Sequence, residues 1–365
     1  MENAKKCLLL IPRMGAGGAE RVMATIANNL CREYEVRIVT MTDAESFYPL
    51  DSRVTIAGLG QSVNRANKLT KLYTKAVGGA KGFFALRRMV KEWQPDVLLS
   101  FLEDTNAVAL LLKMLGSKCR LIVSDRNDPT TYGRLSQWFE RHFYCKADVV
   151  VCQSEKVTRF FPEKHQKKTT VIPNPIAADA IPPRHEGKRR HTVVGVGRLL
   201  EQKNFPLLIR AFARLPEQFS DYTLEIYGGG RLEERLQKQI DELGFSDRIR
   251  LMGVKKSVMR YIADAALYVM SSDYEGFPNA LAEAMASGIP VISTDFATGV
   301  ARDLIKKENG MVVPVGDEDA LLAAMVNMLS REDEWEDMSR ANRALLETLS
   351  EENVMAQWRR VLEFK

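Results

Sequence analysis

Short apolar runs alternate with segments of helical periodicity along the whole chain. Ala19–Leu30, which follows the first apolar run, spaces its apolar residues as one face of a helix does. Near-continuous apolar strands joined by helices indicate a parallel sheet covered on both faces. In the first half the predicted strands are Leu8–Ile11, Val36–Thr40, Asp96–Ser100, Leu121–Ser124 and Asp148–Cys152.

The pattern starts again after a polar stretch, Pro182–Arg190. The strands predicted there are His191–Gly195, Leu224–Tyr227, Ile249–Met252, Leu267–Ser271 and Val291–Thr294. We therefore expect an α/β protein with two doubly wound parallel sheets that face each other across a cleft. The expected domains are residues 1–175 and 176–348, with a terminal helix at 349–365 that packs back on the first domain.

Composition places the chain among ordinary globular proteins. Of its 365 residues, 45% are hydrophobic and 27% charged, which excludes disordered, collagen-like and disulfide-rich classes. Its five cysteines are scattered and form no C-x-x-C pair, so we expect reduced thiols in a cytoplasmic protein and no zinc site. No apolar run approaches the roughly 18–20 residues of a membrane span, and we expect a soluble or peripheral protein.

Positive charge is concentrated in the first half of the chain. Residues 1–175 hold 27 Lys and Arg but 17 Asp and Glu, and Ser52–Lys91 holds no acid at all. This stretch resembles a basic amphipathic helix, which an anionic membrane surface attracts. The alternative is that the basic residues form a helix face exposed only to solvent. Binding to nucleic acid is disfavoured, because no DNA- or RNA-binding motif accompanies the basic stretch. We expect Gly78-Gly79 to end the helix before an exposed Phe83-Phe84 pair. The candidate membrane residues are Arg65, Lys68, Lys71, Lys75, Arg87 and Arg88.

The stretch Ser271–Pro290 reads as strand, tight loop, helix and strand. Pro278 suits the first turn of the helix, where free N–H groups and the helix dipole make an anion site suited to a phosphate. Glu275 precedes this site, and Glu283 follows more than one turn into the helix, where a carboxylate can bind ribose hydroxyls. The alternative is an ordinary loop with two surface acids. The residues expected at the anion site are Phe277, Pro278, Asn279, Ala280 and Leu281.

A second candidate lies just after the first strand of the second half, in Gly195–Asn204. Gly197 lets backbone approach a ligand, and Arg198 and Lys203 bring two cations to the strand end. Together the two cations can hold a diphosphate without a metal ion and stabilise it as a leaving group. The alternative is a loop with two exposed cations.

Other glycine loops and acids carry weaker signals. Gly17 and Gly18 lie in a glycine-rich loop that can accommodate phosphates or an acceptor, and Gly228 lies in a Gly-Gly-Gly turn. Glu103 and Asp104 follow a strand and either bind acceptor hydroxyls or cap a helix. Asp317-x-Asp319 has the form of a metal motif, but it precedes a helical run, and we interpret it as an acidic helix start. Histidines at 142, 165, 185 and 191 show no ligand spacing.

Together these residues resemble the glycosyltransferase family 4 pattern within the GT-B fold of two Rossmann-like domains, over most of the chain. Glu275 and Glu283 form the E-x7-E pair, and Arg198 and Lys203 lie in a G-R-L-x-x-x-K-N run. Further matches are Val171-Ile-Pro-Asn-Pro, Asn309-Gly310 and the crossing terminal helix. The stretch Ser124–Pro129 resembles S-E-R-N-D-P of a bacterial subgroup that acts on polyprenyl-linked or envelope glycans, with Asp125 in place of Glu.

The resemblance implies a retaining, metal-independent enzyme that needs no cofactor. Arg198 and Lys203 would bind the donor diphosphate, Glu283 the ribose, and Glu275 with the Phe277–Asn279 backbone the donor sugar. Arg126 would reach the cleft, where many relatives place a histidine. Apart from the resemblance, Glu103 and Asp104 are acceptor candidates from their position after a strand, together with Arg126. Gly17, Gly18, Gly197, Gly228 and Gly253 complete the expected donor site.

The expected function is transfer of a hexose or N-acetylhexosamine from a nucleotide-sugar, with UDP favoured by the family, to a lipid-linked or other glycan at the cytoplasmic face of the membrane. One alternative is a nucleotide-sugar epimerase of the same fold, but such an enzyme has no need for the basic stretch. An NAD-dependent oxidoreductase, with Asp43 on a ribose, lacks the full glycine fingerprint at Arg13–Gly18. A non-catalytic membrane adaptor has no use for both Glu275 and Glu283.

Overall fold

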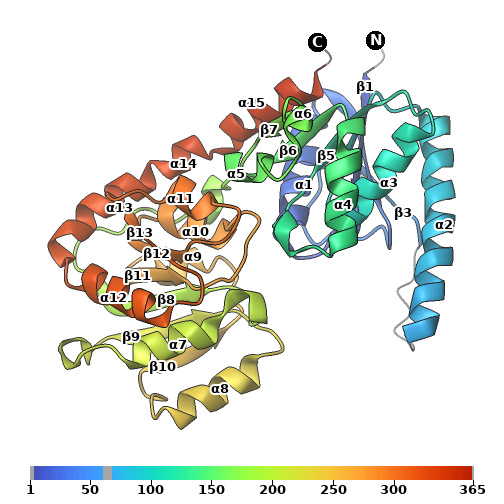
Figure 1. The fold of residues 1–365 in the computed structure, drawn as a ribbon. Coiled ribbons are helices and arrows are strands. Elements are labelled where there is room, and N and C mark those ends of the chain that lie inside the picture. The colour runs from blue at the N-terminus through green and yellow to red at the C-terminus, as the bar shows by residue number, and fades with distance from the viewer. Residues whose placement is uncertain (1–3, 61–67, 364–365) are drawn as a thin grey trace. The chain divides into compact units, whose positions relative to one another are not determined.

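The computed structural model describes residues 4–60 and 68–363, with the side chains of 68–79 left undescribed. The chain divides into two compact units, each built on its own sheet (Figure 1). Unit 1 comprises Met1–Pro173 and Met355–Lys365, and unit 2 comprises Asn174–Val354.

Unit 1 has a seven-stranded parallel sheet in the order β3-β2-β1-β4-β5-β6-β7. Its central strands are mainly apolar, as strands covered on both faces are, and Cys7–Ile11 is wholly buried. The strands are β1 (Lys5–Ile11), β2 (Tyr34–Thr40), β3 (Thr55–Gly58), β4 (Val97–Phe101), β5 (Arg120–Ser124), β6 (Val149–Cys152) and β7 (Thr169–Val171).

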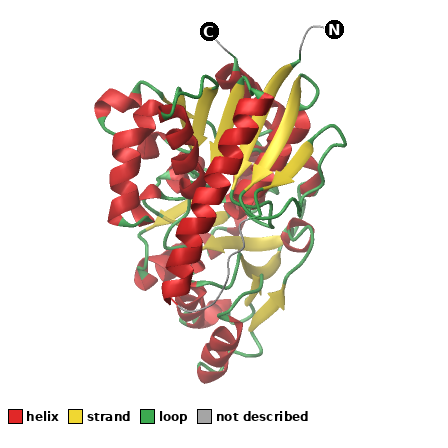
Figure 2. Ribbon diagram, turned by 90° about the vertical axis from the view of Figure 1, so that its right-hand side faces the viewer, coloured by secondary structure: helices red, strands yellow, loops and turns green. Residues whose placement is uncertain are grey.

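Three helices of unit 1 pack on one common core over the sheet, because α2, α3 and α4 all contribute to the cluster that contains Leu98, Leu121 and Val150. Figure 2 shows helices in front of and behind the yellow strands. The helices of this unit are α1 (Gly18–Leu30), α2 (Lys68–Trp93), α3 (Glu103–Met114), α4 (Arg134–Phe143), α5 (Glu155–Thr158), α6 (Glu163–Gln166) and the later part of α15 (Glu351–Leu362). Among the described residues, no helix is both long and apolar enough to cross a bilayer.

Helix α2 does not end at Gly78-Gly79 as the sequence predicts, but continues through both glycines to Trp93. A glycine inside a helix costs only about 1 kcal/mol relative to alanine. The turns that follow are held by packing, since Leu86 is fully buried and Phe83 packs on the same cluster, and this packing overrides the local preference. Phe84 is exposed as expected, whereas Phe83 is half-buried.

Unit 2 has a six-stranded parallel sheet in the order β10-β9-β8-β11-β12-β13. The strands are β8 (Arg190–Val196), β9 (Thr223–Tyr227), β10 (Ile249–Gly253), β11 (Ala265–Met270), β12 (Val291–Thr294) and β13 (Gly310–Val313). The helices are α7 (Phe205–Ala213), α8 (Glu233–Glu242), α9 (Met259–Ile262), α10 (Asn279–Ala286), α11 (Val300–Leu304), α12 (Glu318–Leu329), α13 (Trp335–Arg343) and α14 (Leu345–Thr348).

Two apolar clusters form the core of unit 2, one with α7, α8 and α12 and the other with α9, α10 and α11. The expectation of two doubly wound parallel sheets is confirmed. Because the strands of each sheet are parallel, the loops after them emerge at one edge, where the candidate residues of each unit lie.

Candidate functional site

Two glycine loops interlock at the carboxyl ends of β8 and β9. The N–H of Gly197 donates to the carbonyl of Tyr227 at 2.9 Å, and that of Leu199 donates to Gly229 at 2.9 Å. A Cβ added to Gly228, whose φ is +147°, would lie 1.8 Å from the Gly197 carbonyl oxygen. Gly253 ends β10 and accepts from the N–H of Gly228 at 3.0 Å. The absence of side chains at these glycines lets the loops after β8 and β9 pack closely against each other.

Lys203 and Glu275 form a buried ion pair beside these loops. Lys203 ends a 3-10 helix, Glu201–Lys203, and its Nζ lies 2.5 Å from Oε1 of Glu275. The exposed fractions of the two side chains are 14% and 9%. Ser272 donates to the same carboxylate oxygen at 2.7 Å, and Gln202 Nε2 lies 3.4 Å from the other. The Glu275 carboxylate is therefore held in place by three neighbours.

Arg198, by contrast, has an exposed side chain. None of the residues that the structure describes forms a hydrogen bond or ion pair with its guanidinium. The loop thus presents one paired and one unpaired cation after β8, and the unpaired one has all its donors available to an anion.

Helix α10 begins beside this pair. Pro278 is its N-cap, and the first helical hydrogen bond runs from Ala282 to Pro278 at 3.0 Å. The N–H groups of Ala280 and Leu281 therefore have no acceptor within the helix. Asn279 Oδ1 accepts from Asn174 at 2.9 Å, and Phe277 is buried beneath the turn.

Glu283 lies partly buried one turn into α10. Burial first, and then the charges of Glu275 and Glu283, hold the pKa of Tyr268 well above its ordinary value. Glu275 lies in the loop between β11 and α10, and Glu283 lies on α10 itself. Arg198, Lys203, Glu275 and Glu283, predicted from separate motifs, thus converge on the loops at one edge of one sheet.

In unit 1, Gly17 and Gly18 lie where α1 begins. Gly17 caps the helix, and its carbonyl accepts from the Tyr48 hydroxyl at 3.2 Å. A Cβ on Gly17 would lie 2.1 Å from Oε2 of Glu20, so the glycine makes room for that buried acid.

Arg126 follows β5 and is buried. Its guanidinium carbon lies 4.4 Å from the ring centre of Phe101 and 5.3 Å from that of Trp358 on α15. Burial lowers its pKa to about 9. Within unit 1 the terminal helix therefore supplies an aromatic face to the S-D-R-N-D-P segment.

A buried acidic cluster, not predicted from the sequence, surrounds Asp125. The carboxylate of Asp125 accepts from Tyr144 at 2.9 Å and from Asn106 at 3.1 Å, and burial raises its pKa to about 7. Glu140 on α4 is buried with neither carboxylate oxygen bonded among the described residues, and burial raises its pKa to about 10. Glu103, the first residue of α3, adds its charge to both, whereas Asp104 is exposed.

The remaining candidates lie apart from these loops. Arg87 and Arg88 are exposed on α2, and Arg88 pairs with Glu92 at 2.7 Å. Arg65 and the side chains of Lys68, Lys71 and Lys75 lie outside the described residues. Asp317 accepts from Ala320 at 2.9 Å as the N-cap of α12, which confirms the acidic helix start. Within the described ranges, no group of three His, Cys, Asp or Glu is arranged to hold a metal ion.

Family models match both halves of the chain. Residues 16–180 match the model described as glycosyltransferase family 4, and residues 179–345 match that described as glycosyl transferases group 1.

Two proteins of Campylobacter jejuni are similar over nearly their full length. The GalNAc-alpha-(1->4)-GalNAc-alpha-(1->3)-diNAcBac-PP-undecaprenol alpha-1,4-N-acetyl-D-galactosaminyltransferase is 32% identical over 90% of this chain and 89% of its own. The N-acetylgalactosamine-N,N'-diacetylbacillosaminyl-diphospho-undecaprenol 4-alpha-N-acetylgalactosaminyltransferase is 28% identical over 89% of this chain and 90% of its own.

Solved structures share the fold at lower identity. Anabaena Alr3699/HepE in complex with UDP superposes with a TM-score of 0.79 at 16% identity, covering 98% of this chain and 99% of its own. The apo form of the lipopolysaccharide outer core galactosyltransferase WaaB superposes with a TM-score of 0.77 at 19% identity, with the same coverage.

Proposed function

The chain belongs to glycosyltransferase family 4, and on that premise we propose which sugar transfer it performs. The donor is a UDP-linked hexose or N-acetylhexosamine, and the acceptor is a lipid-linked or other glycan of bacterial envelope polysaccharide synthesis. Both Campylobacter relatives carry undecaprenol-linked acceptors in their names, and the Anabaena structure holds UDP. The comparisons give no support to an epimerase or an oxidoreductase.

One observation carries the donor site: two cations and an open helix N-terminus meet at one edge of the unit 2 sheet. Arg198 is unpaired among the described residues, Lys203 faces Glu275 at 2.5 Å, and the first N–H groups of α10 lack helical acceptors. This set is complementary to a diphosphate. Glu283 takes the ribose hydroxyls, and Glu275 with the Phe277–Asn279 backbone takes the donor sugar.

We propose transfer with retention of configuration, as the resemblance to family 4 implies. The bond between the anomeric carbon and the diphosphate oxygen breaks, and the acceptor oxygen bonds to the same face of the sugar. The departing phosphate accepts the proton of the acceptor hydroxyl, so UDP leaves with that proton. Arg198 and Lys203 stabilise the charge that develops on the leaving group, and no metal is required for that step.

The acceptor binds to unit 1 in this proposal. Glu103 and Asp104 begin α3 just after β4, and Arg126 follows β5. Glu103 and Asp104 accept hydrogen bonds from sugar hydroxyls, and Arg126 gives the site a cation. Gly17 and Gly18, at the start of α1, stay proposed donor-binding residues.

We further propose that the enzyme is peripheral at the cytoplasmic face of the membrane. The acid-free stretch Ser52–Lys91 supports this, because anionic lipids attract each nearby lysine or arginine by about 1 kcal/mol. Reversing Lys68, Lys71 and Lys75 to glutamate should reduce sedimentation with anionic vesicles and leave UDP binding intact. Unchanged sedimentation would reject this location.

Thermal-shift measurements with UDP, GDP and ADP test the donor class. The right nucleotide at a hundredfold excess over its Kd stabilises the protein by about 2.7 kcal/mol. UDP should give the largest shift, and the shift should persist in EDTA. No shift with any nucleotide would reject the proposal. Incubation of the nucleotide-sugar without acceptor separates transfer from epimerisation, since only an epimerase then changes the sugar.

A further inference from the structure

Unit 1 contains a pocket at the opposite ends of its strands from the loops described above. It has a volume of about 660 Å³ and lies between the last turns of α2 and the end of α3, beside the starts of β4 and β5. Ser124–Arg126 stand at the other end of β5. The pocket is therefore separate from the proposed acceptor residues.

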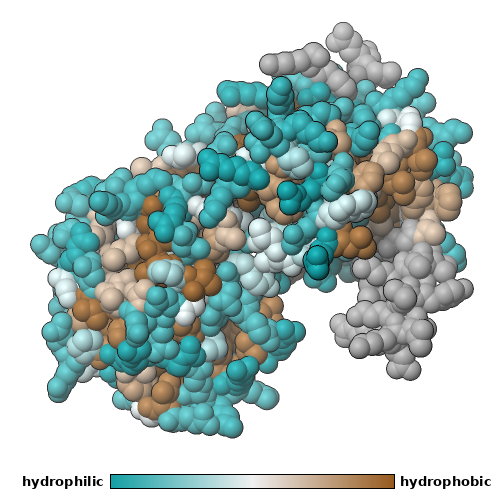
Figure 3. Space-filling model, viewed as in Figure 1, coloured by the Kyte–Doolittle hydropathy of each residue, from teal (hydrophilic) through white to brown (hydrophobic). Residues whose placement is uncertain are grey.

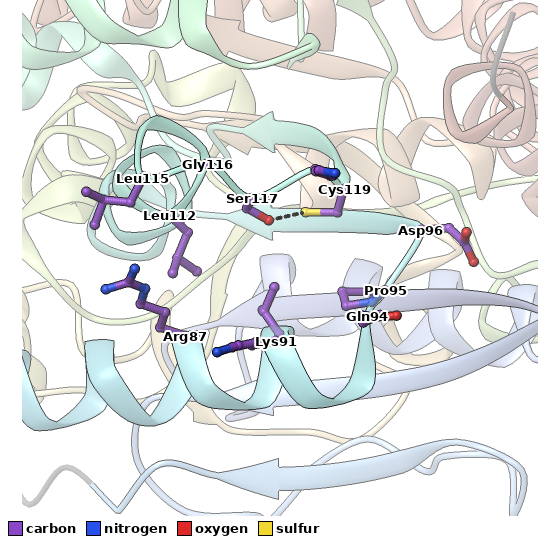
Figure 4. Close-up of a pocket in the computed structure, with 12 residues that line it drawn as sticks. Arg87, Lys91, Gln94, Pro95, Asp96, Leu112, Leu115, Gly116, Ser117 and Cys119 are labelled. Atoms are coloured by element: carbon purple, nitrogen blue, oxygen red, sulfur yellow. Dashed lines mark hydrogen bonds between the residues drawn. The ribbon is translucent and has the colours of Figure 1, made fainter.

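Three cations line this pocket together with an apolar wall. The cations are Arg87, Lys91 and Lys118, and the wall includes Val90, Leu112 and Leu115. Figure 4 shows Arg87 extending from α2 toward the α3 end that carries Leu112 and Leu115, with the Lys91 side chain lying along α2.

The charge of these cations is not compensated within the described part of the chain. No described residue forms an ion pair or hydrogen bond with the side chains of Arg87, Lys91 or Lys118, and all three are exposed. Arg88, the next residue of α2, forms an ion pair with Glu92 at 2.7 Å. The acid on the lining, Asp96, accepts from the backbone N–H of Lys6 at 2.7 Å and points away from the two α2 cations (Figure 4). The pocket therefore has the charge to bind an anion.

Large apolar side chains are exposed on the two helices that border the pocket, and one of them, Leu115, is part of its lining. Phe84 on α2 is 62% exposed, and Met114 and Leu115 at the end of α3 are 48% and 50% exposed. Figure 3 shows apolar surface over this part of unit 1. An anion that brings an apolar chain would cover these side chains as well as pair the cations.

We propose that this pocket binds the phosphate headgroup of an anionic phospholipid. Arg87, Lys91 and Lys118 pair with the phosphate, and Phe84, Met114 and Leu115 contact the upper part of the acyl chains. Charge complementarity selects a lipid of this class. The inference rests on the proposed membrane location and adds to it a defined lipid site beyond the lysines of the early α2 turns.

Vesicle co-sedimentation of the full chain tests the pocket. The wild type should bind phosphatidylcholine vesicles that contain phosphatidylglycerol and should bind pure phosphatidylcholine weakly. Neutralisation by Arg87→Gln, Lys91→Gln or Lys118→Gln should each lower the partition coefficient about fivefold, and the triple variant about a hundredfold. The UDP-induced thermal shift should be unchanged in the triple variant, which shows that it folds and that the donor site is independent.

Two matched variants distinguish a pocket from a diffuse positive field. Arg32→Gln removes an exposed arginine beyond the end of α1 and should leave vesicle binding unchanged. Arg88→Gln should cost clearly less than Arg87→Gln, because Glu92 already neutralises Arg88. Equal losses at positions 87 and 88, or unchanged binding of the triple variant, would overturn the pocket. If the wild type binds these vesicles but shows no UDP-induced thermal shift, the proposed donor site is contradicted and the lipid pocket is not.

Soluble probes identify the source of the phosphate. Dihexanoylphosphatidylglycerol below its micellar concentration should stabilise the wild type and not the triple variant. Inorganic phosphate at the same concentration should have little effect, because it does not cover the apolar wall. Equal stabilisation by both probes would overturn the assignment to a lipid.

Discussion

Replacement of Glu275 by glutamine leaves Lys203 buried without a counter-charge. The pair is short, 2.5 Å, and the side chains are only 14% and 9% exposed, so solvent screens the interaction little. Glutamine has nearly the same shape and keeps a hydrogen-bonding oxygen for Ser272. The variant therefore tests charge and leaves packing almost unchanged.

Breaking a buried pair by removing one partner costs about 3–5 kcal/mol, and we expect the lower end because glutamine still accepts a hydrogen bond. For a unit of this size, 1 kcal/mol corresponds to about 2–4 °C in Tm. Glu275→Gln should thus lower the Tm of the free protein by roughly 6–12 °C. A bound diphosphate supplies the missing counter-charge, so UDP should raise the Tm of the variant by more than it raises that of the wild type.

The assay is a thermal melt with and without saturating UDP, combined with a transfer measurement. Asp273→Asn is the matched control, since it makes the same acid-to-amide change on the same loop at an exposed residue, which accepts from Asn204 at 2.7 Å. It should shift the Tm by less than about 4 °C, as exposed side-chain pairs contribute about 1 kcal/mol or less. Transfer should fall in Glu275→Gln despite the tighter UDP binding. An unchanged Tm, or a UDP shift smaller than that of the wild type, would refute the reasoning.

Three further outcomes are expected. Arg198→Gln should weaken UDP binding about tenfold or more in titration calorimetry and leave the Tm unchanged, because the side chain is exposed and has no partner among the described residues; an unchanged Kd would count against its role. Gly228→Ala should lower the Tm far more than Gly253→Ala, because its Cβ would lie 1.8 Å from the Gly197 carbonyl oxygen while that of Gly253 meets nothing within 4 Å; equal losses in melts would contradict this. Burial raises the pKa of Glu140 to about 10 from 4.5, so the folded state holds a proton that the unfolded state releases, and stability contributed by this group falls as pH rises from about 4.5 to about 10. The unfolding midpoint of Glu140→Gln minus that of the wild type should therefore be larger at pH 8 than at pH 5. The same difference at both pH values would refute the raised pKa.

The sheets could be predicted where their strands are buried on both faces. The runs at β1, β4, β5, β11 and β12 are continuous and apolar, so periodicity finds them. β3 and β7 were not predicted, because each has three or four residues and none of them is buried. β13 was also missed, since its four residues include a glycine and only two are buried.

The candidate donor residues could be found because each lies in a local motif. Their contacts could not, since Lys203 and Glu275 are 72 positions apart and only the folded sheet brings them together. The acidic cluster around Asp125 depends in the same way on the burial of Glu140 in α4. No local signal distinguishes this glutamate from its exposed neighbours. Helix α2 shows the converse, because its packing overrides the local signal of two glycines.

A crystal structure of the full chain with UDP, grown in EDTA, would test the donor site most directly. We predict that both phosphates lie at the carboxyl ends of the unit 2 strands, with the Arg198 guanidinium and the Lys203 ammonium within 3.2 Å of their oxygens, about the limit for such hydrogen bonds. A diphosphate bound elsewhere, with Lys203 still on Glu275 and Arg198 in solvent, would contradict the account.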